Sequence, residues 1–351
     1  MRVEAFVYPA PWSQLVAAAR RAEAAGFDAV TIPEIVNEPL MDLALASQVT
    51  QRVSLRTGIL VAFPRSPMVV ASTAMELHRN SGGRVVLGLG TQVKGHIERR
   101  FGMPWPDAPA RQLSDYVKAL RAIWLCWQRR QPLRFDSEYY RLSVMTPEFS
   151  HPPTSFGPIP VYTAAVRAAM LRLAGRVGDG VRLHGFCTRR YLEEVVVPQL
   201  DRGLEQGGRP RDRFEVCGGG FICTGPTDEV VARQVEHVRY RTAFYGSTRT
   251  YAPVMELHGW GDLAAELHRM SKAGKWEQMA AQIPDDVVHT FAAVARWDGL
   301  AKAVEERFGG ISDAVELQFA HDTAVEPLRD VLTDVSRIPT RFERHPTWDE
   351  L

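Results

Sequence analysis

Residues 83–103 read GRVVLGLGTQVKGHIERRFGM, in which a run of β-forming apolar residues leads into a Gly-Leu-Gly step and a polar turn. The apolar run predicts a buried strand that ends at this step. The glycines do not form a dinucleotide fingerprint, because the third glycine would have to stand at Val93 and the motif follows the fourth predicted strand rather than the first. They predict instead a sharp turn at the end of a strand.

Seven other segments have a similar strand pattern, and helical patterns alternate with them along the chain. These strands are predicted at residues 3–8, 28–33, 52–60, 159–165, 179–184, 214–225 and 313–320. Eight strand–helix units, with apolar strands that lack strict alternation, favour a closed (β/α)8 TIM barrel over a doubly wound sheet. We expect one α/β domain over residues 1–351, with insertions after strands 4 and 7 at about 93–158 and 245–284.

Local signals add detail to this barrel. Gly26 is predicted to end the first helix as a C-terminal glycine. The helix that starts near Arg111 is predicted to turn Trp124 and Trp127 inward. The polar tail, residues 340–351, is expected to be loosely held.

The composition of the chain argues against nucleic-acid and membrane partners. The chain has 42 Lys and Arg against 41 Asp and Glu, and this net charge of +1 is too small to gather nucleic acid or an anionic membrane. No signal-peptide pattern occurs, and no apolar run approaches the roughly 20 residues of a membrane span. We therefore expect a cytoplasmic protein with no nucleic-acid or membrane partner. Its cysteines are expected to be reduced and buried: Cys126, Cys187, Cys217 and Cys223.

Known catalytic motifs are missing from the sequence. The histidines lack the spacing of a catalytic metal site, so no metal is predicted. There is no nucleophile elbow and no P-loop, which removes support for a triad hydrolase or a nucleoside triphosphatase.

Candidate catalytic residues follow from the fold, because the active site of a TIM barrel lies at the carboxyl ends of the strands. Glu34, Asn37 and Glu38 follow the second predicted strand, and His184 ends the sixth. Such groups act as general acids or bases when their surroundings move the pKa towards neutrality. For Glu34 we favour catalysis. For Asn37 and Glu38, capping of the helix that begins at Pro39 is the alternative.

Three segments together resemble the bacterial luciferase-like monooxygenase superfamily. They are AAGFDAVTIPE (24–34), the long stretch from RVSLRTGIL to GLGTQ (52–92), and IPVYTAA followed by RLAGRVGDGV (159–181). Within the superfamily, the chain is most similar to the branch of mycobacterial-type oxidoreductases that use the deazaflavin coenzyme F420. The resemblance covers most of the chain and implies a homodimer that acts on a small-molecule substrate.

The resemblance also implies a cofactor site at the rim of the barrel. A non-prolyl cis peptide bond behind the deazaflavin ring would fall at Gly58-Ile59. Further cofactor contacts are implied on the third strand, on the turn after the fourth and on the loop after the fifth: Val61, Ala62, Gly90, Thr91, Gln92, Ala164, Ala165, Val166 and Arg167.

Two positions depart from the pattern that the resemblance implies. Arg167 replaces a glycine, so its side chain either blocks the approach of the backbone to a phosphate or binds the phosphate itself. Asn37 stands where relatives tend to carry histidine, and an amide cannot shuttle a proton near neutral pH.

Three functions follow from the sequence. The leading one is hydride transfer between F420 and an unidentified organic substrate, with Glu34, Glu38 and His184 as candidates for proton handling. The second is an FMN-dependent monooxygenase of the same fold. The third is a cofactor-poor or non-catalytic ligand-binding barrel, suggested by the two departures.

Overall fold

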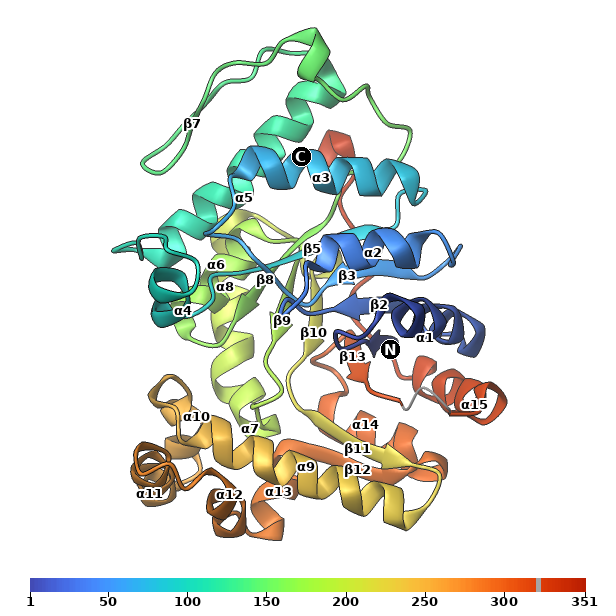
Figure 1. The fold of residues 1–351 in the computed structure, drawn as a ribbon, viewed down its shortest axis with the longest axis vertical. Coiled ribbons are helices and arrows are strands. Elements are labelled where there is room, and N and C mark those ends of the chain that lie inside the picture. Colours follow the sequence, from blue (N-terminus) through green and yellow to red (C-terminus); the bar gives the residue numbers. More distant parts are fainter. Residues whose placement is uncertain (320–322) are drawn as a thin grey trace.

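The computed structural model describes residues 1–319 and 323–351, and its centre is a closed parallel barrel (Figure 1). The barrel strands are β1 (Arg2–Phe6), β2 (Ala29–Ile32), β3 (Ser54–Thr57) with its continuation β4 (Leu60–Val61), β5 (Val85–Gly90), β8 (Val161–Ala165), β9 (Gly180–Leu183), β10 (Glu215–Gly218) and β13 (Ala314–Leu317). The sheet closes because β1 pairs with β13 and β3 pairs with β5. The predicted TIM barrel is confirmed. Of the eighth predicted strand, residue 320 lies outside the described residues.

Helices surround the barrel. They are α1 (Trp12–Ala25), α2 (Pro39–Ser47), α3 (Pro67–Asn80), α5 (Pro109–Arg129), α6 (Ala168–Val177), α7 (Arg189–Tyr191), α8 (Val197–Gly207), α14 (Leu300–Phe308) and α15 (Val325–Ser336). α5 packs against α3 and α6, so it serves as the barrel helix after β5 although it lies within the first predicted insertion. Trp124 and Trp127 are buried on this helix, as predicted. No helix of the described part is both long and apolar enough to cross a membrane.

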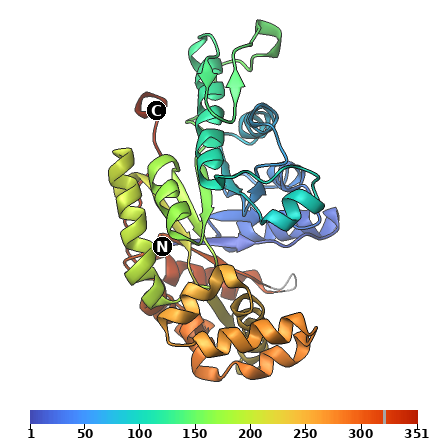
Figure 2. The same ribbon diagram turned by 90° about the vertical axis from the view of Figure 1, so that its left-hand side faces the viewer.

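The remainder of the first predicted insertion decorates the barrel. It holds α4 (Lys94–Arg99) and a small antiparallel hairpin of β6 (Phe135–Asp136) and β7 (Arg141–Leu142). The hairpin projects beyond the helices that cover the barrel (Figures 1 and 2).

The seventh predicted strand, 214–225, is two strands in different sheets rather than one. Gly218 and Gly219 both have positive φ angles, 78° and 102°, which glycine adopts without a steric penalty. The chain turns there and leaves the barrel. β11 (Phe221–Gly225) then pairs in parallel with β12 (Ala292–Arg296). Because β-forming residues stand on both sides of the glycines, the sequence predicted one continuous strand here.

Between β11 and β12 the chain forms a separate helical layer at one end of the molecule (Figures 1 and 2). Its helices are α9 (Asp228–Gly246), α10 (Ala252–Leu257), α11 (Gly261–Lys272), α12 (Trp276–Met279) and α13 (Asp285–Phe291). This excursion, residues 221–296, is longer than the insertion predicted at 245–284. It also places a cluster of aromatic residues next to the barrel.

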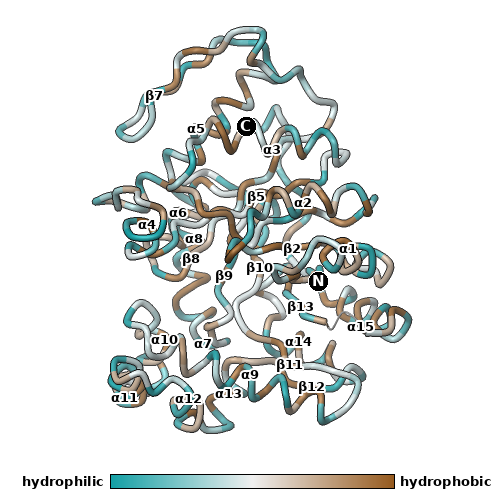
Figure 3. The backbone as a smooth tube through the Cα atoms, viewed as in Figure 1, coloured by the Kyte–Doolittle hydropathy of each residue, from teal (hydrophilic) through white to brown (hydrophobic). Residues whose placement is uncertain are grey.

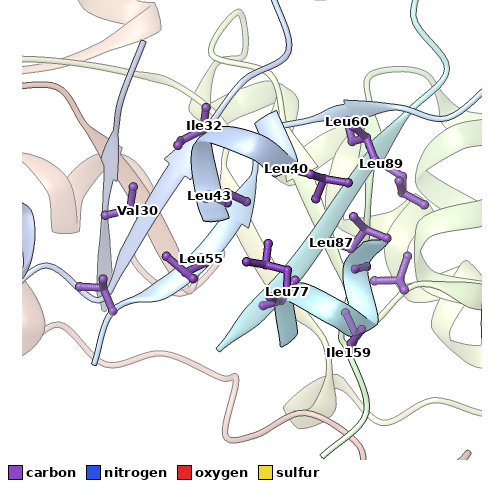
Figure 4. Close-up of a cluster of buried hydrophobic side chains, with 14 of the residues drawn as sticks. Val30, Ile32, Leu40, Leu43, Leu55, Leu60, Leu77, Leu87, Leu89 and Ile159 are labelled. Carbon is purple, nitrogen blue, oxygen red and sulfur yellow. The ribbon is translucent and has the colours of Figure 1, made fainter. Parts of the chain in front are cut away.

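The largest apolar core lies between the barrel strands and their helices. Leucines from β3, β5 and α2 meet there, among them Leu55, Leu87 and Leu43, which are fully buried (Figure 4). Figure 3 shows the same pattern along the chain, with hydrophobic residues concentrated on central strands such as β2 and β5. Each buried leucine stabilises the fold by about 1.5–3 kcal/mol, so this core fixes the positions of the strand ends.

The tail, residues 340–351, is not loosely held, which corrects the prediction. Phe342 is 7% exposed, and the Arg2 guanidinium lies 4.5 Å from the centre of its ring. His345 Nε2 lies 2.6 Å from the Tyr162 hydroxyl, and Trp348 Nε1 donates to a backbone carbonyl at 2.9 Å. Most residues of this segment are polar, but its few aromatic residues attach it to the amino-terminal end of the barrel.

Candidate active site at the carboxyl end of the barrel

Gly88 and Gly90 of β5 allow this strand to pack closely against β3, β4 and the step between them. The Gly58-Ile59 peptide bond is cis, at the step that the resemblance implies. A Cβ atom on Gly90 would lie 2.6 Å from Ile59 Cδ1, and one on Gly88 would lie 2.1 Å from the Thr57 carbonyl oxygen. Both distances are far below van der Waals contact, so only glycine fits at position 88, beside a backbone oxygen, and a larger residue at position 90 would displace the Ile59 side chain.

The turn after β5 is closed by its own hydrogen bonds. Gln92 has a φ angle of 58°, in the left-handed region that few non-glycine residues adopt. Its side-chain oxygen accepts from the Val93 amide at 3.0 Å, and its carbonyl accepts from the Thr91 hydroxyl at 3.0 Å. The predicted contacts Val61 and Ala62 are buried next to this turn.

The loop after β8 leads from Ala164 and Ala165 through Val166 into helix α6. Arg167 stands immediately before the helix with φ −102° and ψ 157°, an extended conformation that does not require glycine. Its side chain is exposed. Among the described residues it has no hydrogen-bond or ion-pair partner. The guanidinium is therefore free to meet an anion at the start of α6.

Glu34 and Glu38 are both paired with Arg65. The Glu34 side chain is 4% exposed, and its carboxylate accepts from the Val61 amide at 2.8 Å and from Arg65 Nη1 at 3.0 Å. Glu38 pairs with Arg65 Nη2 and also accepts from the Leu40 amide at 3.4 Å, as the cap of α2. The two carboxylates thus hold β4 and α2 in position, which agrees with the capping alternative for Glu38.

Asn37 lies in the same loop but is tied to α2. Its amide nitrogen donates to Asp42 Oδ2 at 2.6 Å, and its oxygen accepts from the Ile35 amide at 3.2 Å. Both ends of the side chain are therefore occupied.

His184 follows β9 directly, at the predicted place. The Phe186 amide donates to its Nδ1 at 2.9 Å, so the ring hydrogen resides on Nε2. Burial, and to a smaller extent Arg241, lower the pKa of His184 to about 3. The imidazole is therefore neutral near pH 7 and can donate a hydrogen bond from Nε2.

The interior of the barrel holds a chain of ion pairs whose residues are not among the predicted site residues. Arg56 Nη1 lies 2.7 Å from Glu4 and 2.9 Å from Glu215, and all three residues are buried. Burial alone would raise the pKa of Glu215, but Arg56 and Arg2 outweigh it and hold the pKa at about 2. One sequence signal could have found these groups: each is a charge flanked by uncharged, mostly apolar neighbours in a β-forming run, as in VEA, LRT and FEV.

The chain of ion pairs continues to the rim through Arg182. Its Nη2 atom lies 2.9 Å from Glu4 and 2.5 Å from Glu316. The Nη1 atom is buried without a partner among the residues that the structure describes. A Cβ atom on Gly58 would lie 3.4 Å from Arg182 Nε, so this guanidinium lies beside the cis peptide step.

Glu316 brings a carboxyl group to the mouth of the barrel. Its side chain is 34% exposed, and burial raises its pKa above the ordinary value of 4.5 despite the nearby Arg182. Neither Glu34 nor Glu38 offers a comparable group inside the barrel, because Arg65 holds both. In the described part of the chain, no group of three or more metal-binding side chains is arranged around a common point.

Comparison with known proteins adds to this geometry. A family model described as luciferase-like monooxygenase matches residues 2–312. An uncharacterized protein of Mycobacterium tuberculosis (strain H37Rv) is 45% identical over 304 residues, covering 85% of this chain and 89% of that protein. An F420-dependent glucose-6-phosphate dehydrogenase of Intrasporangium calvum is 28% identical over 317 residues, covering 86% of this chain and 85% of that protein.

A solved structure shares the fold over nearly the whole chain. The coenzyme F420-dependent tetrahydromethanopterin reductase of Methanopyrus kandleri superposes with a TM-score of 0.77 at 18% identity. The match covers 95% of this chain and 98% of that one.

Proposed function

Since the chain belongs to the luciferase-like monooxygenase family and is an oxidoreductase, we propose that it transfers a hydride between coenzyme F420 and a small organic substrate. Relatives and a fold neighbour that carry F420 in their names support this choice of cofactor. The bound coenzyme would supply the hydride chemistry, while the protein binds, orients and handles protons.

The observation that carries the proposal is the combination of small residues and a free donor at the rim. Gly58, Gly90 and Ala164 carry little or no side chain at the carboxyl ends of β3, β5 and β8; Gly58 and Ala164 are partly exposed there, so a flat ring system could lie close to the backbone. Arg182 Nη1 is a buried donor without a partner in the described chain. A buried donor of this kind suits the carbonyl oxygens of a deazaflavin ring.

We propose the other predicted contacts as the remainder of this cofactor site. The turn at Thr91 and Gln92 and the residues Val61 and Ala62 would border the ring. Arg167 would bind the phosphate of the cofactor arm, because its exposed guanidinium has no partner among the residues described and stands at the positive end of α6.

For proton handling we favour Glu316 over the residues predicted from sequence. Glu34 and Glu38 are engaged by Arg65 and by backbone amides of β4 and α2, Asn37 has no titrating group, and His184 is neutral. Glu316 combines partial exposure at the mouth with a raised pKa, so it can hold a proton closer to neutral pH than an ordinary carboxyl group.

A titration tests the proposal and its alternatives. We expect F420 fluorescence to be quenched on binding, and Arg167→Ala to weaken the affinity roughly tenfold through loss of a charge-assisted hydrogen bond. Arg176→Ala, an exposed position in the last turn of the same helix, is the matched control and should leave the affinity unchanged.

Each other outcome points to another function. Binding of FMN alone would favour the monooxygenase, which the family description supports. Binding of neither would overturn the proposal and favour the cofactor-poor barrel. The homodimer and the cytoplasmic location stay predictions.

A further inference from the structure

A cluster of hydrogen-bond donors stands on the other side of the barrel mouth. Arg241 extends from α9 and donates from Nη1 to the Tyr8 hydroxyl at 3.2 Å and from Nη2 to the Tyr245 hydroxyl at 3.1 Å. Gln318 Nε2 also donates to the Tyr8 hydroxyl, at 3.3 Å. Both phenol oxygens therefore serve as acceptors, and each keeps its own proton to donate elsewhere.

Within the described chain, the Arg241 guanidinium donates only to these two neutral phenol oxygens and to no carboxylate. Arg241 has no carboxylate within 4.0 Å there, and its Nε atom is buried without a partner. His184 adds another donor, because Nδ1 is already an acceptor and Nε2 carries the hydrogen; its ring centre lies 4.3 Å from that of Tyr245. A partly buried guanidinium that meets only neutral acceptors is costly unless an anion joins it.

Aromatic rings border the donor cluster. The Arg241 guanidinium carbon lies 5.8 Å from the centre of the Phe221 ring, and the His184 ring lies 5.0 Å from that of Tyr251. These rings come from β11 and from the turn before α10, within the excursion that leaves the barrel after β10. A ligand that reached Arg241 would therefore place its body against apolar, mostly aromatic surface.

Most of the donor cluster lies apart from the proposed cofactor site, and only His184, which follows β9, stands next to β8. Around the barrel, β1 and β13 lie opposite β8 and β5. Tyr8 and Gln318 follow the first pair of strands, whereas Ala164 and Gly90 end the second pair. An anion at Arg241 would thus face the cofactor across the mouth, on the side where Glu316 lies.

We propose that Arg241, Tyr8, Tyr245 and His184 form a subsite for the anionic group of an organic substrate, a carboxylate or phosphate carried on an apolar or aromatic body. This inference rests on the proposed function, because the subsite places that body against the mouth that would hold F420. The substrate class follows from the surplus of donors, and the nature of the body follows from the surrounding rings.

Calorimetric titration with benzoate tests the subsite, with benzyl alcohol as the neutral analogue and inorganic phosphate as the anion without a body. We expect benzoate to bind more tightly than either of these. Arg241→Met should weaken benzoate binding roughly tenfold to a hundredfold, the range for loss of charge-assisted hydrogen bonds, and Arg241→Lys should restore part of it. Arg233→Met, at an exposed position of the same helix, should leave benzoate binding unchanged.

A second variant keeps the inference testable if Arg241→Met does not fold. Tyr8→Phe retains the guanidinium and removes one hydroxyl donor, so we expect a several-fold loss of benzoate affinity. An unchanged benzoate affinity in either folded variant would overturn the subsite.

The affinity for F420, measured on the same proteins, separates the two proposals. A loss of F420 binding in Arg241→Met, with benzoate binding intact, would assign the cluster to the anionic arm of the cofactor and overturn the subsite. Benzoate binding that depends on Arg241, in a protein that does not bind F420, would support the subsite and contradict the proposed cofactor.

Discussion

Glu316 is the outermost carboxylate in a series of ion pairs that runs along the inside of the barrel. Arg182 contacts both Glu4 and Glu316, so one positive charge is shared between two carboxylates. Burial raises the pKa of Glu316, Glu4 adds to the rise, and Arg182 and Arg241 oppose it without cancelling it. The folded protein therefore binds a proton at Glu316 more tightly than the unfolded chain does.

Glu316→Gln should change how stability depends on pH. Because the folded-state pKa lies above 4.5, the folded protein binds more protons than the unfolded chain once pH exceeds 4.5, and stability falls as pH rises through the folded-state pKa. The variant lacks this contribution. We therefore compare the unfolding free energies of the wild type and the variant by urea denaturation at several pH values. The difference, wild type minus variant, should decrease as pH rises from 4.5 through the folded-state pKa.

Glu343→Gln is the matched control, because Glu343 is exposed and pairs with no cation among the residues described. Its difference from the wild type is the baseline against which the Glu316→Gln difference is compared at each pH. A difference for Glu316→Gln that stays constant or rises with pH would contradict the raised pKa and remove the basis for proton handling at this residue.

At single positions, the sequence predicts backbone conformation better than it predicts partners. Gly26 ends α1 with a φ of 97°, as expected from its place after the last apolar turn. The ion pairs between Glu4, Arg56 and Glu215 join strands far apart in the chain, so no local pattern specifies which charge meets which. Arg65, which occupies both Glu34 and Glu38, could not be identified for the same reason.

At the scale of elements, helix α5 ends in a way that its sequence does not favour. Arg130 follows the helix with φ 54° and ψ 39°, the left-handed conformation that is usual for glycine at this position. A residue with a Cβ atom pays about 1–2 kcal/mol for this conformation. The long helix nevertheless stops there, because its buried face, with Trp124 and Trp127, ends one turn earlier.

Arg130→Gly should stabilise the protein by about 0.5–1 kcal/mol, less than the full steric cost because glycine also loses more freedom on folding. Chemical denaturation measures the change. Arg129→Gly is the control one residue earlier: it lies inside the helix and donates to the Trp348 carbonyl at 2.9 Å, so it should destabilise by about 1 kcal/mol or more. Destabilisation by Arg130→Gly would show that the left-handed cap is not formed.

For the whole molecule, the repeated strand–helix pattern was sufficient to predict the barrel and therefore the end at which its active site lies. The excursion between β10 and β12 was predicted only in part. The three glycines at 218–220 are flanked on both sides by strand-forming residues, so the sequence suggested one long strand instead of two. The donor cluster around Arg241 depends on this excursion. It joins residues from α9 and from the segments that follow β1 and β13, which only the closed barrel brings together.

The tail shows how few residues can attach a polar segment to the barrel. Phe342 is 7% exposed and contacts both the Arg2 guanidinium and the His345 ring, whose centre is 4.8 Å away. His345 of the tail also contacts the Tyr162 hydroxyl. That hydroxyl donates a hydrogen bond to Glu215, the member of the ion-pair series nearest the amino-terminal end of the barrel. Loss of the tail would open this end of the barrel to water.

Phe342→Ala should therefore destabilise the protein by about 3 kcal/mol, the low end of the range for a buried phenylalanine, since the site lies near the surface and can partly collapse. Phe149→Ala, at a residue that is 79% exposed, should change the unfolding free energy by less than about 0.5 kcal/mol. Urea denaturation of both variants decides between the two views of the tail. Equal, small effects would mean that residues 340–351 are loosely held after all, and that His345 does not close the amino-terminal end of the barrel.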